Sequence, residues 1–144
     1  EAVSLGAPTG PLGLVHRPGN GATPYYDALR HSAVYPAYHV AAGLTRAAGA
    51  KLVTATSSDE TRVRTLAYRG RDATLLWLAN LTARDQSVQV DHAGVDPFGI
   101  VLDEASFERA VTDPAGFQTD VSPIDLGQLR LRPYAVALAC LKDA

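Results

Sequence analysis

The sequence predicts a mainly β protein: an antiparallel two-sheet β-sandwich with one N-terminal helix and an irregular N-terminal loop region. Three observations lead to this prediction. Residues 73–81, ATLLWLANL, form the most apolar run, and polar turn residues bound it on both sides. A run of this length without a helical stripe is typical of a strand buried on both faces. From residue 51 onward, several segments alternate polar and apolar residues, whereas Gly and Pro crowd the first 32 positions.

Composition narrows the function classes before any motif is considered. The chain has 144 residues, of which 47% are hydrophobic and 19% charged, as in globular domains with a real core. The net charge of -2 gives no electrostatic basis for binding nucleic acid or an anionic membrane. No apolar run approaches the ~20 residues that span a bilayer. Neither nucleic acid nor a membrane is therefore expected as a partner, and the single cysteine, Cys140, excludes a disulfide within the chain.

The first 32 residues are expected to be irregular, apart from a possible short strand at Val3–Leu5. Gly and Pro at this density interrupt both helices and strands. The segment also carries His16, Arg17, His31 and the pair Tyr25–Tyr26. Two interpretations of these side chains stay open. They are ordinary loop surface, or they line a ligand site, because loops often carry function.

Residues 34–48 are predicted to form the helix. Pro36 suits its first turn, and Gly49 stands where a left-handed C-terminal cap belongs. The apolar face expected from the i, i+3, i+4 rule consists of Ala37, Val40, Ala41, Leu44 and Ala48. We expect this face to pack on the sandwich or on a second copy of the chain, which makes a homodimer possible. His39 has no second ligand at helical spacing and is interpreted as structural.

The rest of the chain is predicted to consist of short strands joined by turns. The expected strands are 51–56, 61–69, 73–81, 86–91, 99–102, 128–132 and 134–141. Residues 103–111 are expected to be a helical turn or a short strand, and residues 113–123 a loop. In the last strand, alternation places Val136 and Leu138 opposite a face of alanines. The side chains predicted to be mostly buried are Leu75, Trp77, Val88, Val136 and Leu138.

No motif in the sequence names a reaction. The triplet Asn80–Leu81–Thr82 has the form of a glycosylation site, but such triplets are common by chance. Asp59–Glu60 and Asp103–Glu104 are sequence neighbours, which suits turns and caps better than a glycosidase pair facing across a cleft. The chain lacks a nucleophile elbow, a phosphate-binding glycine motif and zinc-ligand spacing. We therefore predict no catalytic residue, no metal site and no cofactor in this chain.

The order of the parts resembles a known enzyme arrangement. Residues 1–17, EAVSLGAPTGPLGLVHR, are similar to the last strand and following loop of a (β/α)₈ barrel, and residues 34–40, VYPAYHV, to its last helix. The barrel type is that of the large glycoside hydrolase clan with two catalytic glutamates. The segments that resemble the β-sandwich following such barrels are 56–59, 66–69, 75–82 and 129–136. Within the clan, the likeness is to the D-apionate lactonase type, a bacterial hydrolase of sugar-acid lactones.

The resemblance implies a domain division and a larger parent enzyme. Residues 1–50 would be a remnant of the last barrel strand, loop and helix, and residues 51–144 the C-terminal β-sandwich. A whole barrel needs about 250 residues, so this chain would be a fragment. The catalytic glutamates lie on earlier barrel strands, so no catalytic residue is carried over. Thr9, His16 and Arg17 would border the substrate pocket of the parent.

The expected function is therefore a non-catalytic C-terminal portion of a carbohydrate-active hydrolase, either glycosidase-like or a sugar-acid lactonase, which braces the barrel. The partners would be the parent's own barrel and, for the parent, a sugar or sugar-acid ligand. The isolated chain is expected to be inactive, and its location cytoplasmic. Two alternatives stay open. A carbohydrate-binding module would show an exposed row of aromatic side chains, and a stand-alone interaction domain would need no barrel.

Overall fold

The computed structural model describes residues 8–10, 13–18, 24–70, 72–91 and 95–142. The strand expected at Val3–Leu5 lies outside these residues. The chain forms two compact units. The first contains residues 1–46 and 107–119, and the second contains residues 47–106 and 120–144. Each unit is treated by itself below.

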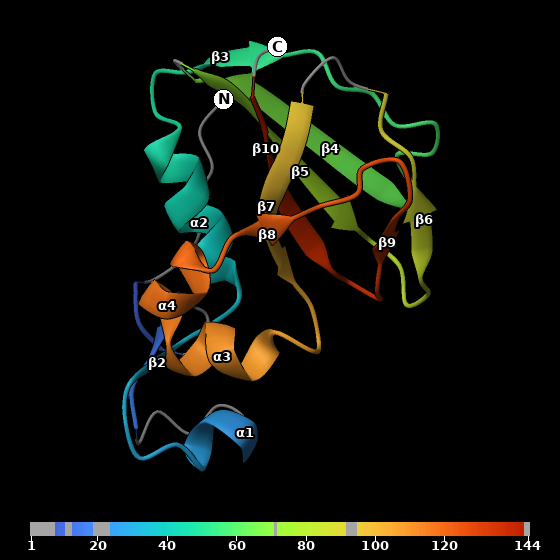
Figure 1. Cartoon of the computed structure of the whole chain (residues 1–144). Helices are drawn as coiled ribbons and strands as arrows, with labels where there is room; N and C mark the ends of the chain where they lie inside the picture. The colour runs from blue at the N-terminus through green and yellow to red at the C-terminus, as the bar shows by residue number, and fades with distance from the viewer. Residues whose placement is uncertain (1–7, 11–12, 19–23, 71, 92–94, 143–144) are drawn as a thin grey trace. The chain divides into compact units, whose positions relative to one another are not determined.

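The second unit is built on a six-stranded antiparallel sheet (Figure 1). Its strands, in spatial order, are β3 (Lys51–Val53), β4 (Val63–Arg69), β5 (Ala73–Asn80), β10 (Val136–Lys142), β7 (Val95–Leu102) and β8 (Ser122–Pro123). A second antiparallel sheet consists of β6 (Gln86–Val88) and β9 (Leu129–Leu131). The predicted mainly β, antiparallel sandwich is confirmed, and β5 is one of its central strands.

The core of the second unit lies between the two sheets. Its most buried side chains come from both layers and from the loop before β9, and they include Leu78, Leu126, Leu131, Ala137 and Ala139. The alanines of β10 are fully buried, whereas Val136 and Leu138 on its other face are only half-buried. Val136 and Leu138, which were predicted to be mostly buried, are thus less buried than the alanines, and the alanine face is the inner one. Small side chains on β10 leave room for leucines from the opposite layer, so volume and not hydrophobicity decides which face is inner.

Close packing at the centre of the sheet also explains one glycine. A Cβ atom added to Gly99 in β7 would lie 2.0 Å from the carbonyl oxygen of Leu138 in β10. No side chain fits at that distance, because real Cβ contacts are far longer. Gly99 is thus required by the approach of two backbones.

The outer face of the six-stranded sheet is also apolar. Strand register places Trp77 of β5 opposite Leu66 of β4 and Leu138 of β10 on this face. Trp77 and Tyr68 are buried, and the Trp77 Nε1–H donates to the Tyr68 hydroxyl at 3.2 Å. Leu76 and Leu78 are buried on the inner face of the same strand. The prediction that this strand is buried on both faces is confirmed at its centre, although Leu75 is half-buried, as is Val88 of β6.

Among its described residues, the first unit combines a short strand pair with four helices. The strands are β1 (Val15–His16) and β2 (Ala33–Val34), which pair antiparallel. The helices are α1 (Pro24–Asp27), α2 (Ala37–Arg46), α3 (Phe107–Thr112) and α4 (Pro114–Thr119). Within the described residues, no helix is long and apolar enough to cross a membrane.

Helix α4 corrects the predicted loop at residues 113–123. Asp113 precedes it, and the Gly116 amide donates to the Asp113 Oδ1 at 3.0 Å, which is an N-cap hydrogen bond. Pro114 follows in the first turn, where its missing amide costs nothing. The Asp-Pro pair was a helix start signal that the loop prediction overlooked.

Helix α2 confirms the predicted helix but with a different buried face. Its buried residues are His39, Ala41 and Gly43, whereas Ala37 and Leu44 are exposed. The predicted apolar stripe is therefore wrong except at Ala41 and the half-buried Val40. The physical reason is that the His39 ring packs edge-on against Phe117 of α4 and turns the helix toward it.

Candidate functional site

The three residues predicted to border a parent pocket lie in one short segment of the first unit. Thr9 forms an isolated bridge with Val15, and the Gly10 amide donates to the Val15 carbonyl at 3.2 Å. His16 and Arg17 follow Val15 directly. Their exposure differs sharply: Thr9 is half-buried, His16 is fully buried and Arg17 is exposed. A ligand can therefore reach Arg17 and Thr9 in this structure, but it cannot reach His16.

His16 belongs to an aromatic cluster that we define as His16, Tyr25, Tyr26, Tyr35 and Phe107. Its Nδ1 lies 3.3 Å from the Tyr35 hydroxyl, and its ring centroid lies 5.3 Å from that of Tyr26. The Tyr26 and Tyr35 rings are 4.5 Å apart. Burial, helped by the neighbouring tyrosines, raises the pKa of Tyr26 to about 12, so its hydroxyl stays protonated. Among the described residues, His16 Nε2 is a buried side-chain nitrogen without a hydrogen-bond partner.

His39 is the second buried histidine of the first unit, and it fastens three helices together. Its Nε2–H donates to the Ala110 carbonyl of α3 at 2.8 Å, and its Nδ1 accepts from the Gln118 amide of α4 at 3.3 Å. This pattern requires the neutral ring. Desolvation lowers the pKa of His39 and outweighs the opposing effect of the bond to Ala110. The interpretation of His39 as structural is confirmed.

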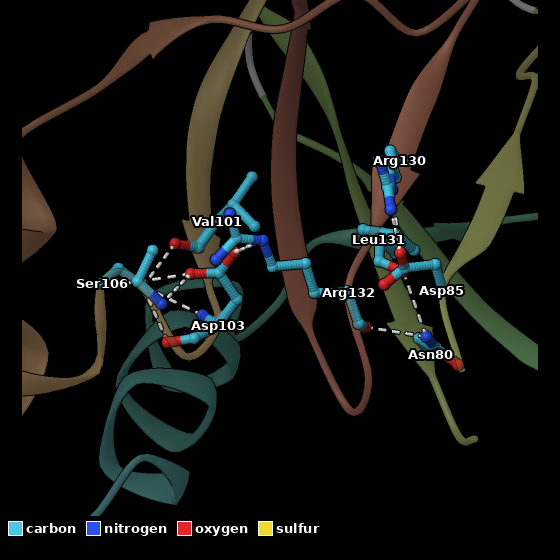
Figure 2. Close-up of polar contacts among 9 residues, drawn as sticks. Asn80, Asp85, Val101, Asp103, Ser106, Arg130, Leu131 and Arg132 are labelled. Carbon is cyan, nitrogen blue, oxygen red and sulfur yellow. Dashed lines mark hydrogen bonds and ion pairs between the residues drawn. The ribbon is translucent and has the colours of Figure 1, made fainter. Parts of the chain in front are cut away.

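Polar side chains gather in the second unit where β5 ends and the β9–β10 turn begins (Figure 2). Asn80 is buried, and its amide donates to the carbonyls of Arg84 at 2.7 Å, Leu131 at 3.2 Å and Arg132 at 2.7 Å. Its Oδ1 accepts from the Thr82 amide and hydroxyl, both at 2.9 Å. All the hydrogen-bonding capacity of Asn80 is thus used inside the protein. The glycosylation interpretation fails on this geometry, because the side chain is inaccessible.

A second group of contacts stabilises the end of β7, as Figure 2 also shows. The Asp103 Oδ1 accepts from the amides of Ala105 and Ser106, and Ser106 Oγ accepts from the Asp103 amide at 2.9 Å. This reciprocal pattern works like a capping box. Arg132 Nε lies 3.7 Å from Asp103 Oδ2, and Arg130 Nε donates to Asp85 Oδ2 at 2.9 Å. The expectation that the acidic pair 103–104 serves a turn or cap is confirmed for Asp103.

The turn held by Asn80 presents an exposed aromatic ring. Tyr134 is 66% exposed and has a φ of 56°, a left-handed conformation that a tyrosine adopts at some cost. The Tyr134 amide donates to the Thr82 carbonyl at 3.1 Å, which keeps the turn in place. No sequence pattern predicts this conformation at a tyrosine, because Gly or Asn is the usual residue there.

The other predicted acidic pair also has a structural role. The Thr61 hydroxyl donates to Asp59 Oδ1 at 2.6 Å, and Arg62 Nε lies 3.0 Å from Asp59 Oδ2. The Thr61 hydrogen bond is the main cause of the lowered pKa of Asp59. Glu60 pairs with Arg64 at 2.9 Å. Both carboxylates are thus engaged in the turn before β4.

A groove of about 1040 Å³ opens in the second unit beside the small sheet. One wall is formed by residues 53–59, between β3 and β4, and the other by residues 86–91 of β6 and its extension. Its floor includes Thr65, Leu76 and Leu78 of the six-stranded sheet. None of the described lining residues is aromatic. Among the described residues, we find neither a set of acid, base and nucleophile groups converging on this groove nor a cluster of metal-ligating side chains.

These features define the class of the protein as an antiparallel β-sandwich domain accompanied by a second, mainly helical unit. A family model for the D-apionate lactonase, C-terminal immunoglobulin-like domain, matches residues 60–139, which are 80 of the 144 residues. The chain therefore belongs to this family of D-apionate lactonase C-terminal domains.

A solved structure is similar as well. It is a GH30 endoxylanase from Clostridium papyrosolvens C71, with a TM-score of 0.51 and 15% sequence identity. The alignment covers 76% of this chain and 28% of the endoxylanase chain, so this protein spans less than a third of that relative. At this identity, the similarity shows the fold alone. No curated protein matches the chain.

Proposed function

We propose that this chain is the non-catalytic C-terminal portion of a carbohydrate-active hydrolase, of the glycosidase-like or sugar-acid lactonase kind, and that its sandwich braces the parent's (β/α)₈ barrel. Family membership in a lactonase C-terminal domain supports the proposal. The similarity of fold to part of a larger endoxylanase agrees with it. The parent's substrate would be a sugar or a sugar-acid lactone.

The observation that carries the proposal is the six-stranded sheet, which is apolar on both faces. In a free-standing sandwich, the outer face of each sheet is polar and the strands alternate cleanly. Here the outer face carries Leu66, Leu75, Trp77 and Leu138 on neighbouring strands. Leu52, opposite Tyr68 on the same face, is 77% exposed, and Leu66 is 38% exposed. Trp77 is already buried on this face, so it is the exposed leucines, Leu52 and Leu66, that indicate a partner, which we propose to be the barrel.

We further propose that residues 1–50 are the remnant of the last barrel unit and residues 51–144 the sandwich domain. The segment from Thr9 to Arg17 would then follow the last barrel strand and border the parent's pocket. Thr9 and Arg17 would then contact the ligand of the parent. His16 is fully buried, so it would position Tyr35 through their hydrogen bond rather than touch the ligand.

The test compares the 144-residue chain with the full-length parent, assayed side by side on aryl glycosides and on sugar-acid lactones. We expect turnover by the parent only, because the chain has no converging catalytic set among its described residues. In the parent, Arg17→Ala should raise KM and leave kcat nearly unchanged, whereas the exposed-loop control Arg30→Ala should change neither. Turnover by the isolated chain would overturn the non-catalytic role, and unchanged constants in Arg17→Ala would overturn its place at the pocket.

The carbohydrate-binding alternative has less support. The exposed aromatic residues, Tyr25 and Tyr134, belong to different units, so within the described part of the chain no row of exposed rings crosses a sheet face. Homodimerisation through the helix and a cytoplasmic location stay predictions. Sedimentation analysis and cell fractionation of the parent test them.

A further inference from the structure

We propose that the groove between residues 53–59 and 86–91 is the seat of an extended polypeptide strand, which pairs with the free edge of β6 and enlarges the two-stranded sheet. The strand would come from a part of the parent enzyme outside these 144 residues. The inference rests on the proposed function only for the existence of that parent. It concerns the inner groove and not the outer face of the six-stranded sheet.

The lining of the groove shows that β6 turns its edge toward it. Every residue from Gln86 to Asp91 lines the groove. A strand that offered one of its faces would contribute alternate residues, because successive side chains point to opposite sides. Among the described strands, β6 pairs with β9 alone. Its other edge therefore presents backbone N–H and C=O groups to the groove, which is the arrangement that accepts an added strand.

The floor and the walls suit a strand with alternating side chains. The floor ends on the core residues Leu76 and Leu78, which are only 5% and 1% exposed, so the apolar side chains open to the groove are mainly the half-buried Val88 and Val90 of the β6 wall. The opposite wall is held in place by a hydrogen bond from the Thr65 hydroxyl to the Ala55 carbonyl at 3.0 Å. An inserted strand would place every second side chain on the apolar floor and the others toward solvent.

Other occupants fit less well. A sugar ligand would find no aromatic ring among those lining residues that the structure describes. A charged sugar acid would compete with existing contacts, because Arg62 pairs with Asp59 and the Lys142 ammonium lies 5.1 Å from the centre of the Phe98 ring. By contrast, the matched family is a C-terminal domain, and the chain spans 28% of the similar endoxylanase. A strand from the same polypeptide also needs no high concentration of a free partner.

Hydrogen–deuterium exchange of the 144-residue chain and of the full-length parent tests the proposal directly. We expect the amides of Ser87, Gln89 and Asp91 to exchange at least about tenfold more slowly in the parent, because the Val90 amide already donates to the Leu126 carbonyl at 2.8 Å and successive strand amides point to opposite edges. Residues 129–131 of β9 form the matched control, since they belong to the same small sheet but do not line the groove. Equal exchange of the Ser87, Gln89 and Asp91 amides in the two proteins would overturn the proposal.

A crosslinking experiment identifies the occupant. A photoreactive benzoylphenylalanine replaces Ser87 in the parent, and the control carries it at Arg130, the residue opposite Ser87 in β9. The proposal predicts a crosslink within one molecule from position 87 to a segment outside the 144 residues, and none to that segment from position 130. Crosslinks between two molecules, or protection of residues 86–91 in the isolated chain by added xylo-oligosaccharide, would refute it. A substitution on the outer face of the six-stranded sheet, such as Leu52→Lys, tests the proposed function separately. If it destabilises the parent while the exchange and crosslinking results contradict the added strand, the strand proposal is wrong and the proposed function stands.

Discussion

Replacing Asn80 with alanine should cost a large part of the protein's stability. The substitution removes the amide that donates to the carbonyls of Arg84, Leu131 and Arg132, and the oxygen that accepts from Thr82. A hydrogen bond contributes about 1 kcal/mol net, and a buried group left without a partner costs about 1–3 kcal/mol. With several such groups affected, we expect the free energy of unfolding to fall by about 3–5 kcal/mol. The total is on the order of 5–15 kcal/mol for a protein of this kind.

Urea unfolding followed by Trp77 fluorescence measures this loss. Gln89→Ala, at an exposed position, is the control, and its free energy of unfolding should stay within about 0.5 kcal/mol of that of the unsubstituted 144-residue chain. Asn80→Asp separates the two halves of the side chain, because it keeps an acceptor for Thr82 but points a carboxylate at three carbonyls. It should therefore be at least as damaging as Asn80→Ala at neutral pH and recover partly in acid. A loss under about 1 kcal/mol for Asn80→Ala, with an unchanged m-value, would refute the reasoning.

Three further predictions concern the protonation of His39, the packing of Gly99 and the activity of the isolated chain. Burial lowers the pKa of His39 from its ordinary 6.5, so on acidification the unfolded state takes up the proton before the folded state does. The contribution of neutral His39 to the free energy of unfolding is therefore complete above pH 6.5 and is lost as the pH falls toward the folded-state pKa. Unfolding measured between about pH 8 and about pH 5 should show this loss, and His39→Gln should flatten it. Gly99→Ala should cost about 3 kcal/mol or more, because its Cβ would meet the Leu138 carbonyl, and a normal melting temperature would contradict this. The isolated chain should hydrolyse neither glycosides nor lactones, and measurable turnover that copurifies with it would show otherwise.

The sequence predicted those strands whose local residue pattern matches their burial in the folded protein. The apolar run around Trp77 predicted a strand buried on both faces, and the alternation after residue 51 predicted the antiparallel strands. The inner face of β10 could not be predicted, because the choice between Ala137 and Leu138 depends on the volume of leucines supplied by the opposite layer. The buried face of α2 depended likewise on Phe117, a residue 78 positions from His39 in sequence.

In the candidate site too, some features could be predicted from the sequence and others could not. Thr9, His16 and Arg17 were placed in one loop by resemblance, and they do lie in one segment, but the full burial of His16 required a tertiary contact with Tyr35. The sequence pattern marks Asn80 only as the first residue of a glycosylation triplet. A better signal was present, since a polar residue at the end of the most apolar strand needs partners when it is buried. The groove had no sequence signal, because it arises between segments that are about 30 residues apart.

The outer face of the six-stranded sheet offers the most direct test of the central claim, that the sandwich braces a barrel. Leu52→Lys should change the unfolding free energy of the 144-residue chain by no more than about 0.5 kcal/mol, because Leu52 is 77% exposed there. In the full-length parent the same change should cost about 2 kcal/mol or more, since a leucine covered by the barrel contributes about 1.5–3 kcal/mol. Gln128→Lys, an exposed control before β9, should be neutral in both proteins. An equally small effect of Leu52→Lys in the chain and in the parent would contradict the account.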